Sequence, residues 1–565
     1  MAANGLYYGD NLDVLRESIA TESVDLVYLD PPFNSNASYA ILFREPSGLQ
    51  SQAQIEAFED TWHWGNEAEV AFDQVIRSGN TSAADLLRAL RSFLGENDMM
   101  AYISMMAVRF IELHRVLKKS GALYIHCDPT ASHYLKILLD GIFGYENFRS
   151  EIIWRRSGSH NSARMQFGPV HDTIFFYAKT KEHKLRPVFT PQSRASIAKE
   201  FRYSDDSGIY RLNEIMGPGP RTGDSGKPWR GYNPTSVGRH WAVPESIKRL
   251  LPDGASGLSL QQQLDALHEI GAIYISKEGR PKYKQRPTDG VALQDVWAFQ
   301  PGTEGCLFNS NAAIDEDVRW LGSEVERLGY PTQKPVGLLE RIIRSSSDVD
   351  SIVLDPFCGC GTTIHAAQKL GRHWVGIDVT HLAISLIERR LKDAFPGITF
   401  EVHGTPQDLD GARDLALRDK YQFQWWAVSL IEAQPYGGKK KGADGGIDGL
   451  IYFRSGAKTT ERAIVSVKGG GVSVPMVRDL KGVLDREKAP IGVFLTLEPP
   501  TRPMEKEAAS AGFYKLGERQ YPRVQLITVE QALAGVKPAI PLIDTGAAFK
   551  RAPREGRGDQ TTLFS

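Results

Sequence analysis

Cysteine, long apolar runs and net charge are all scarce in this sequence of 565 residues. Its four cysteines (Cys127, Cys306, Cys358 and Cys360) are too few for a disulfide framework in so long a chain, which predicts a reducing compartment. Apolar runs stay far below the ~20 residues of a membrane-spanning helix, and the first residues lack the basic and apolar regions of a signal peptide. We therefore expect a cytoplasmic protein that does not span a membrane.

The near-zero net charge is an average over unlike segments. The 67 Lys and Arg residues nearly balance 68 Asp and Glu residues, for a formal net charge of −1. This balance argues against a surface that is basic all over, yet residues 151–250 hold 17 basic and 9 acidic residues, a local excess of +8. A localised basic region of this kind is sufficient for nucleic-acid binding.

Predicted strands and helices alternate in two separate parts of the chain. Val24–Leu29 and Gly121–Cys127 are apolar at nearly every position, as in strands buried inside a parallel sheet. Residues 34–80 are expected to form a mobile loop, and Ala83–Lys118 one helix. The alternation predicts an α/β fold with a Rossmann-like, doubly wound sheet, an insert in that sheet and a separate second α/β domain. The expected segments are 1–154 and 330–405 (sheet), 155–329 (insert), 406–419 (linker), 420–545 (second domain) and 546–565 (disordered basic tail).

A glycine-rich turn lies between a predicted strand and a predicted helix. It reads Asp355-Pro-Phe-Cys-Gly-Cys-Gly-Thr-Thr363, and Asp378 ends the next strand about 20 residues later. Glycines allow the backbone to approach a ligand closely, and a carboxylate at the second strand end can accept two ribose hydroxyl groups. The combination indicates a nucleoside-containing cofactor far more strongly than a lone glycine turn.

A second motif, Asp30-Pro31-Pro32-Phe33, follows the buried strand Val24–Leu29. In a doubly wound fold the carboxyl ends of strands line the ligand crevice. The prolines lack a backbone N–H, so the Pro31 carbonyl is free to face a ligand beside the Asp30 carboxylate. Two acceptors and the aromatic face of Phe33 suit an exocyclic amine on a planar base.

The residues now resemble a known family, the β-class DNA amino-methyltransferases that use S-adenosylmethionine. Asp30–Phe33 matches their catalytic [DNS]PP[YFW] motif, and Asp355–Gly361 matches their FxGxG cofactor motif. Arg327–Pro335 matches the segment that leads into the following helix, and Tyr8–Asp10 matches the segment that contacts the cofactor adenosine. The resemblance implies a catalytic group of Asp30, Pro31, Pro32 and Phe33. It implies cofactor contacts from Asp10, Lys334, Asp355, Phe357, Gly359, Gly361, Thr362 and Asp378.

The implied reaction moves a methyl group to the exocyclic amine of a base flipped out of duplex DNA. Asp at position 30 resembles the adenine-N6 enzymes more than the cytosine-N4 enzymes, which remain the alternative. An RNA or protein substrate is a further candidate, as is a DNA-binding protein with a vestigial methyltransferase core. The basic insert favours double-stranded DNA, and its arginines are candidate contacts to guanine edges and phosphates: Arg155, Arg156, Arg164, Arg211 and Arg230.

The second domain resembles the Mrr-like branch of the PD-(D/E)xK restriction endonuclease fold over about residues 420–500. Asp448 and Lys468 match the Mg²⁺-binding and water-orienting positions, and Glu432 is a candidate helix carboxylate. Ser466 stands where the family has Glu, Asp or Gln, and a hydroxyl is a poor Mg²⁺ ligand. Three interpretations stay open: an active nuclease in a single-chain restriction–modification enzyme, a degenerate DNA-binding domain, or a structural appendage with an Asp448–Lys468 salt bridge.

The extreme C-terminus carries Gln560-Thr-Thr-Leu-Phe564, which resembles the peptide by which bacterial proteins dock into the sliding clamp. A frayed tail is the competing interpretation. β-class relatives are often homodimers, so the oligomeric state is open. The resemblances as a whole imply a bacterial or phage protein associated with the nucleoid.

Overall fold

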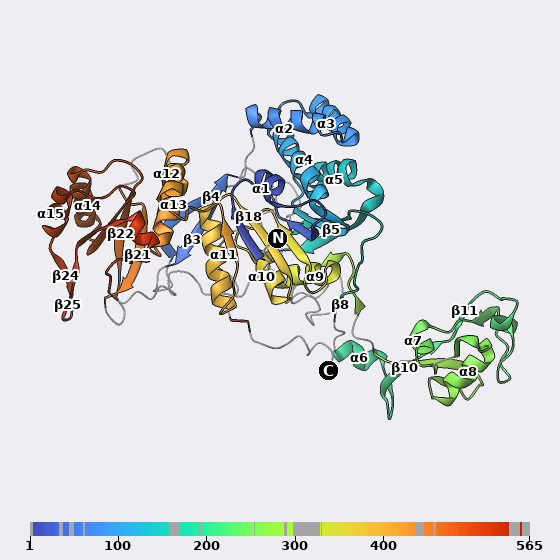
Figure 1. The fold of residues 1–565 in the computed structure, drawn as a ribbon. Helices are drawn as coiled ribbons and strands as arrows, with labels where there is room; N and C mark the ends of the chain where they lie inside the picture. Colours follow the sequence, from blue (N-terminus) through green and yellow to red (C-terminus); the bar gives the residue numbers. More distant parts are fainter. Residues whose placement is uncertain are drawn as a thin grey trace, which may run out of the picture. The chain divides into compact units, whose positions relative to one another are not determined.

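The computed structural model describes residues 4–32, 38–44, 50–59, 63–156, 170–190, 194–252, 255–287, 291–297, 328, 330, 332–436, 446–455, 459–541 and 554–555. Two compact units are present. Residues 187–293 form one of them, and the sheets of the N- and C-terminal parts belong to the other (Figure 1). None of the helices in the described ranges combines the length and hydropathy that a membrane crossing requires.

A nine-stranded sheet dominates the larger unit. Its order is β16-β6-β7-β5-β2-β17-β18-β1-β19, with β16 Val296–Trp297, β6 Phe148–Arg155, β7 His171–Ala178, β5 Leu117–Cys127, β2 Val24–Leu29, β17 Ile352–Asp355, β18 His373–Asp378, β1 Asn4–Tyr8 and β19 Glu401–His403. Strands from both ends of the sequence alternate here, because β17 pairs in parallel with β2 and with β18. The predicted doubly wound sheet is confirmed.

The helices from the same stretches of the chain as this sheet are α1 Asn11–Ser18, α2 Asn66–Arg77, α3 Thr81–Leu94, α4 Asp98–Val116, α5 Ser132–Phe143, α9 Val336–Ser346, α10 Thr362–Lys369 and α11 His381–Ala394. Buried side chains of α4 and α5 form one apolar core with those of β2 and β5. Because β2 is buried on both faces, it reads as a continuous apolar run rather than an alternating one.

Three local expectations were wrong. The expected loop at 34–80 contains the antiparallel pair β3 Ser38–Arg44 and β4 Gln50–Glu59 as well as α2. The expected helix Ala83–Lys118 is two helices, since Gly95 ends α3 at φ +75° and the Asn97 side chain caps α4. The expected insert 155–329 does not lie wholly outside the main sheet, because β7 inserts antiparallel between β5 and β6.

The smaller unit holds the antiparallel sheet β13-β14-β10-β9 and the pair β11-β12. Their bounds are β9 Tyr203–Asp205, β10 Gly208–Glu214, β11 Met216–Pro218, β12 Arg239–Trp241, β13 Ile273–Ile275 and β14 Pro281–Gln285, with helices α7 Glu245–Lys248 and α8 Leu260–Glu269. Trp229 and Trp241 meet edge to face in its apolar core. These two indoles are therefore packing groups of the smaller unit.

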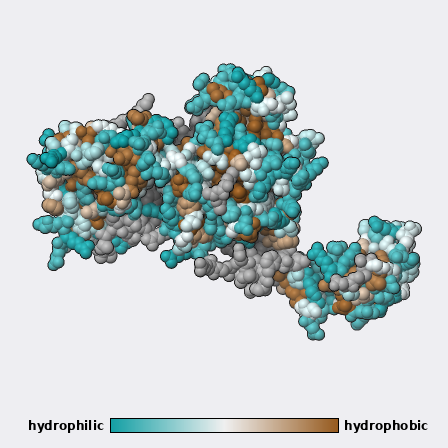
Figure 2. All heavy atoms as spheres, in the orientation of Figure 1, coloured by the Kyte–Doolittle hydropathy of each residue, from teal (hydrophilic) through white to brown (hydrophobic). Residues whose placement is uncertain are grey.

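The C-terminal part has its own sheet, β20-β21-β22-β23-β26, with β20 Gln434–Pro435, β21 Gly449–Arg454, β22 Thr460–Lys468, β23 Ile491–Thr496 and β26 Val524–Thr528. Helices α12 Leu409–Arg418, α13 Lys420–Leu430, α14 Val474–Glu487 and α15 Arg502–Ala509 accompany it. The segment expected to be a linker is mostly α12, which Asp408 caps and which buries Ala412 and Leu415. Polar side chains cover most of the face seen in Figure 2.

Candidate functional site

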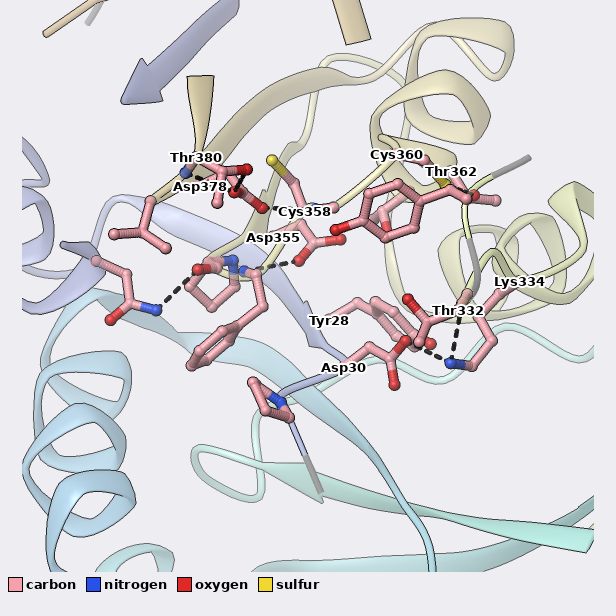
Figure 3. Close-up of a pocket in the computed structure, with 18 of the residues that line it drawn as sticks. Tyr28, Asp30, Thr332, Lys334, Asp355, Cys358, Cys360, Thr362, Asp378 and Thr380 are labelled. Atoms are coloured by element: carbon pink, nitrogen blue, oxygen red, sulfur yellow. Dashed lines mark hydrogen bonds and ion pairs between the residues drawn. The ribbon is translucent and has the colours of Figure 1, made fainter. Parts of the chain in front are cut away.

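A cavity of about 280 Å³ lies at the carboxyl ends of β1, β2, β17 and β18. Figure 3 shows side chains from both halves of the sheet around it, including Asp30 after β2, Asp355 at the end of β17 and Asp378 at the end of β18. Lys334, just before α9, also lines the cavity. The structure thus brings together residues more than 300 positions apart that the motifs had marked separately.

The glycine turn between β17 and α10 forms one wall of this cavity. Gly359 and Gly361 both have positive φ angles, +49° and +72°. A Cβ atom at Gly361 would also approach Cγ1 of Ile387 to 2.7 Å. Backbone conformation and packing therefore both require glycine at position 361.

Gly361→Ala is expected to destabilise the fold by about 2 kcal/mol, because it combines a strained φ with a steric clash. Gly397→Ala is the matched control, since Gly397 has φ +86° but open space around a Cβ. A thermal melt of the two variants separates the clash from the strain. Equal losses in both would show that the contact with Ile387 carries no cost.

Asp378 is held by backbone and side-chain donors from the neighbouring loops. One carboxylate oxygen accepts hydrogen bonds from Thr380 N (2.9 Å) and Thr380 Oγ1 (2.8 Å), and the other accepts one from Gly359 N (2.9 Å). Burial raises the pKa of Asp378 to about 6, although these hydrogen bonds oppose the shift. Burial likewise raises the pKa of Asp355 to about 7. Both carboxyl groups therefore titrate close to neutral pH.

Asp10 and Asn11 connect the start of α1 to the glycine turn. Asp10 accepts from Leu12 N at 2.7 Å as the α1 cap, and Asn11 Nδ2 donates to the Pro356 carbonyl at 2.8 Å. Arg109 of α4 binds both Asp10 carboxylate oxygens, at 2.9 and 3.0 Å. Sequence reasoning missed Arg109, yet an arginine inside the apolar run of α4 was a detectable signal of a buried ion pair.

Asp30 forms an ion pair with Lys334 through one carboxylate oxygen. Its other oxygen, Oδ1, is buried and has no hydrogen-bond partner within the described ranges. Lys334 Nζ also donates to the Thr332 carbonyl at 3.3 Å. Pro31 is buried and Pro32 lines the cavity, whereas Phe33 lies outside the described residues. An unpaired buried acceptor is costly unless a ligand supplies a donor.

The remaining cofactor candidates lie on the same wall. Phe357 and Gly359 belong to the turn, and Thr362 begins α10. All three line the cavity, whereas Gly361 is not among its lining residues and packs against Ile387.

Most of the predicted DNA-contacting arginines already have acidic partners in the structure. Arg211 lies 2.5 Å from Glu200, Arg230 lies 2.8 Å from Asp265, and Arg156 lies 3.3 Å from Asp172. Arg155 ends β6, and Arg164 is outside the described residues. A DNA contact by Arg211 or Arg230 would therefore have to share or replace an existing ion pair.

Asp448 of the C-terminal part is a buried carboxylate with its own set of donors. Oδ2 accepts from Val467 N at 2.7 Å and from Ser466 Oγ at 3.3 Å, and Oδ1 accepts from Gln424 Nε2 at 3.0 Å. Lys468 follows two residues after Ser466 at the end of β22. The structure records no ion pair between Asp448 and Lys468 in the ranges it describes.

Glu432 is not part of this group. It follows the end of α13, and its carboxylate pairs with Lys537 at 3.2 Å. Gln424, in the first half of α13, is the helix residue that contacts Asp448. No cluster of three or more metal-ligating side chains occurs among the residues described.

Comparison with protein families gives two matches. A family described as DNA methylase matches residues 24–389, and a family described as restriction endonuclease matches residues 415–530. The first match contains β2, the insert and the glycine turn. The second contains α13, Asp448 and Lys468.

The chain is similar to several named proteins. It is 32% identical to the type II methyltransferase M.EcaI of Enterobacter cloacae, over 68% of this chain and 69% of that one. It is 26% identical to the StyLTI Mod subunit of a type III restriction-modification enzyme of Salmonella typhimurium, over 64% of this chain and 49% of the relative.

Among solved structures, the cytosine-N4-specific PvuII DNA methyltransferase is 13% identical (TM-score 0.32, covering 71% of this chain and 89% of that one). M1.HpyAVI in complex with SAM is also 13% identical (TM-score 0.27, covering 68% and 99%).

Proposed function

The chain belongs to the DNA methylase family, and we propose that it transfers a methyl group from S-adenosylmethionine to the exocyclic N6 amine of adenine in double-stranded DNA. The observation that carries this proposal is the buried Oδ1 of Asp30, which no described residue pairs, in the cavity that Asp378 and the glycine turn also line. The direct test is transfer of a labelled methyl group from S-adenosylmethionine to duplex DNA by the purified chain. If the chain transferred no labelled methyl group to duplex DNA that contains many different sequences, the proposed function would be contradicted.

The residues around the cavity fit S-adenosylmethionine, which supplies an activated methyl group on its sulfonium sulfur when bound. Each carboxylate oxygen has more than one lone pair, so Asp378 can accept ribose hydroxyl groups while keeping its donors Gly359 and Thr380. Asp10, fixed by Arg109, is the proposed contact on the adenosine side. Lys334 lines the cavity beside Asp30 and is the proposed contact to a ligand carboxylate.

Asp30 carries the chemical step in this proposal. An aryl amine is a weak nucleophile because its lone pair is delocalised into the ring. Hydrogen bonds from the amine to Asp30 and to the Pro31 carbonyl favour a tetrahedral nitrogen and stabilise the positive charge that develops on it. Asp at position 30 favours adenine over cytosine by resemblance, and methylation of cytosine N4 stays the alternative.

Cofactor affinity should depend on pH through Asp378. Its carboxylate must be ionised to accept both ribose hydroxyls, so protonation below its pKa of about 6 weakens binding. We expect affinity at pH 5 to be about 10-fold lower than at pH 8. Isothermal titration of S-adenosylmethionine across this range measures it. The Asp378→Asn variant should bind S-adenosylmethionine weakly at every pH. If the affinity of this variant still fell with falling pH, the pH dependence would be assigned to Asp355.

The C-terminal domain does not fit a Mg²⁺-dependent nuclease centre in the part of the chain described. Of the predicted metal-binding positions Asp448 alone offers a carboxylate here, because Ser466 replaces a carboxylate and Glu432 is engaged with Lys537. Mg²⁺ requires several oxygen ligands in near-octahedral geometry. We therefore infer that this domain keeps the nuclease fold and binds DNA without cutting it.

Two further predictions concern residues outside the described ranges and the assembly of the protein. The clamp-docking peptide Gln560–Phe564 lies outside the described residues, and homodimer formation is untested. Both stay predictions, to be checked by a clamp pull-down with the last six residues removed and by light scattering.

A further inference from the structure

Four polar side chains form a hydrogen-bonded and ion-paired row across three adjacent strands next to the cavity. Tyr28 of β2 lies with its hydroxyl 3.3 Å from His126 Nδ1 on β5. His126 Nε2 lies 2.9 Å from Asp172 Oδ2 on β7, and Asp172 Oδ1 lies 3.3 Å from Arg156 Nε. Tyr28 lines the cavity two residues before Asp30, and both are labelled in Figure 3.

Most of this row of side chains is buried. His126 has no exposed surface, and Tyr28 and Asp172 are each 2% exposed. Burying a charged carboxylate and an imidazole is costly even when they are paired, and apolar side chains of the same volume often serve stability as well. Stability therefore does not account for this row of side chains. One end of the row, Tyr28, lines the cavity.

The partners fix the direction of each hydrogen bond. Burial alone would raise the pKa of Asp172, but the hydrogen bond from His126 and the charges of Arg156 and Lys334 hold the pKa below its usual value. An ionised Asp172 only accepts, so His126 carries its hydrogen on Nε2 and leaves Nδ1 as an acceptor. The Tyr28 phenol, kept neutral by burial and nearby carboxylates, then donates to Nδ1. Its oxygen keeps a lone pair as an acceptor, and Tyr28 lines the cavity.

We propose that the Tyr28 oxygen is a further hydrogen-bond acceptor for the reacting amine, and that His126 and Asp172 are positioning residues that keep its hydrogen turned away. This rests on the proposed function. As the N–CH₃ bond forms and the S–CH₃ bond breaks, the amine becomes positively charged until Asp30 takes one N–H proton. Acceptors on both Asp30 and Tyr28 favour a base edge with an amine over one with a carbonyl, such as guanine O6 or thymine O4.

The Asp172→Asn variant tests the direction of the hydrogen bond between Tyr28 and His126. Arg156 only donates, so the new carbonyl oxygen should face Arg156 and the new NH₂ should face His126 Nε2. His126 would then carry its hydrogen on Nδ1 and donate to Tyr28, which frees the phenol hydrogen to point toward the cavity. A wrong tautomer of this kind is known to impair catalysis while leaving geometry intact.

The experiment measures single-turnover methyl transfer by the full chain carrying Tyr28→Phe, Asp172→Asn, or both. We expect Tyr28→Phe to slow transfer by about 10-fold, as for loss of one hydrogen bond to a charge-developing group. Asp172→Asn should cost at least as much, but the double variant should match Tyr28→Phe within about 2-fold, because the tautomer acts only through the hydroxyl. Binding of S-adenosylmethionine and the melting temperature report on folding.

Tyr124→Phe is the matched control. Tyr124 is in register with Tyr28 on the neighbouring strand and is equally buried, but its hydroxyl bonds Ser346 at 2.7 Å. This variant should keep the wild-type rate. Wild-type speed in Tyr28→Phe, or a full Asp172→Asn loss in the Tyr28→Phe background, would overturn the proposal while leaving methyl transfer established. A wild-type chain that transfers no methyl group would overturn the proposed function itself, and this inference with it.

Discussion

Replacing Asp30 by alanine should slow methyl transfer to DNA by about 10³-fold while S-adenosylmethionine still binds. The substitution removes the carboxylate that accepts the amine hydrogens as positive charge develops on nitrogen. It also removes the carboxylate that pairs with Lys334, so the Lys334 cation near the reacting nitrogen is balanced by one negative charge fewer. At a separation of about 4 Å and an effective dielectric constant near 20, two like charges repel each other by about 4 kcal/mol. Single-turnover transfer of labelled methyl measures the loss.

Asp30→Asn distinguishes charge from shape in this prediction. The asparagine keeps one oxygen acceptor and the approximate volume of the side chain, so its loss of rate should be smaller than that of alanine. Cofactor titration of each variant confirms that the cavity is intact. If Asp30→Ala transferred methyl groups at the wild-type rate, the catalytic assignment of this residue would be lost.

Asp448→Ala should lower the stability of the C-terminal domain by about 3 kcal/mol. The change leaves Val467 N, Ser466 Oγ and Gln424 Nε2 without their acceptor in a buried site. A buried donor without a partner costs about 1–3 kcal/mol. Thermal unfolding followed by circular dichroism, together with limited proteolysis of residues 420–541, measures the effect.

Ser466→Ala is the matched control, because it removes one of these donors together with its hydrogen bond. Its cost should be about 1 kcal/mol. In the same account, wild-type protein with Mg²⁺ or Mn²⁺ leaves supercoiled plasmid uncut. Cleavage by the wild type that Asp448→Ala abolishes without a change in stability would restore the active-nuclease interpretation.

The parts of the cavity that were predictable from sequence are those whose constraints are local. Pro31 and Pro32 restrict their own backbone, and Gly359 and Gly361 adopt φ values that favour glycine. Strand-end position then implies that Asp30, Asp355 and Asp378 meet at one edge of the sheet. The structure brings these three side chains to one cavity.

Contacts that depend on pairing between distant strands were not predictable in this way. The group Tyr28, His126 and Asp172 exists only because β7 inserts beside β5, a pairing that no local pattern announces. Arg109 reaches Asp10 across the space between α4 and the start of α1. Gln424 replaces Glu432 beside Asp448 because sequence identifies a helix but not which of its turns faces the strand.

The most direct test of the central claim is methylation-sensitive sequencing of DNA from a methylation-free host that expresses this chain or its Asp30→Ala variant. We expect N6-methyladenine at one defined sequence with the wild type and none with the variant. Unmodified DNA in both strains, or N4-methylcytosine with the wild type, would contradict it.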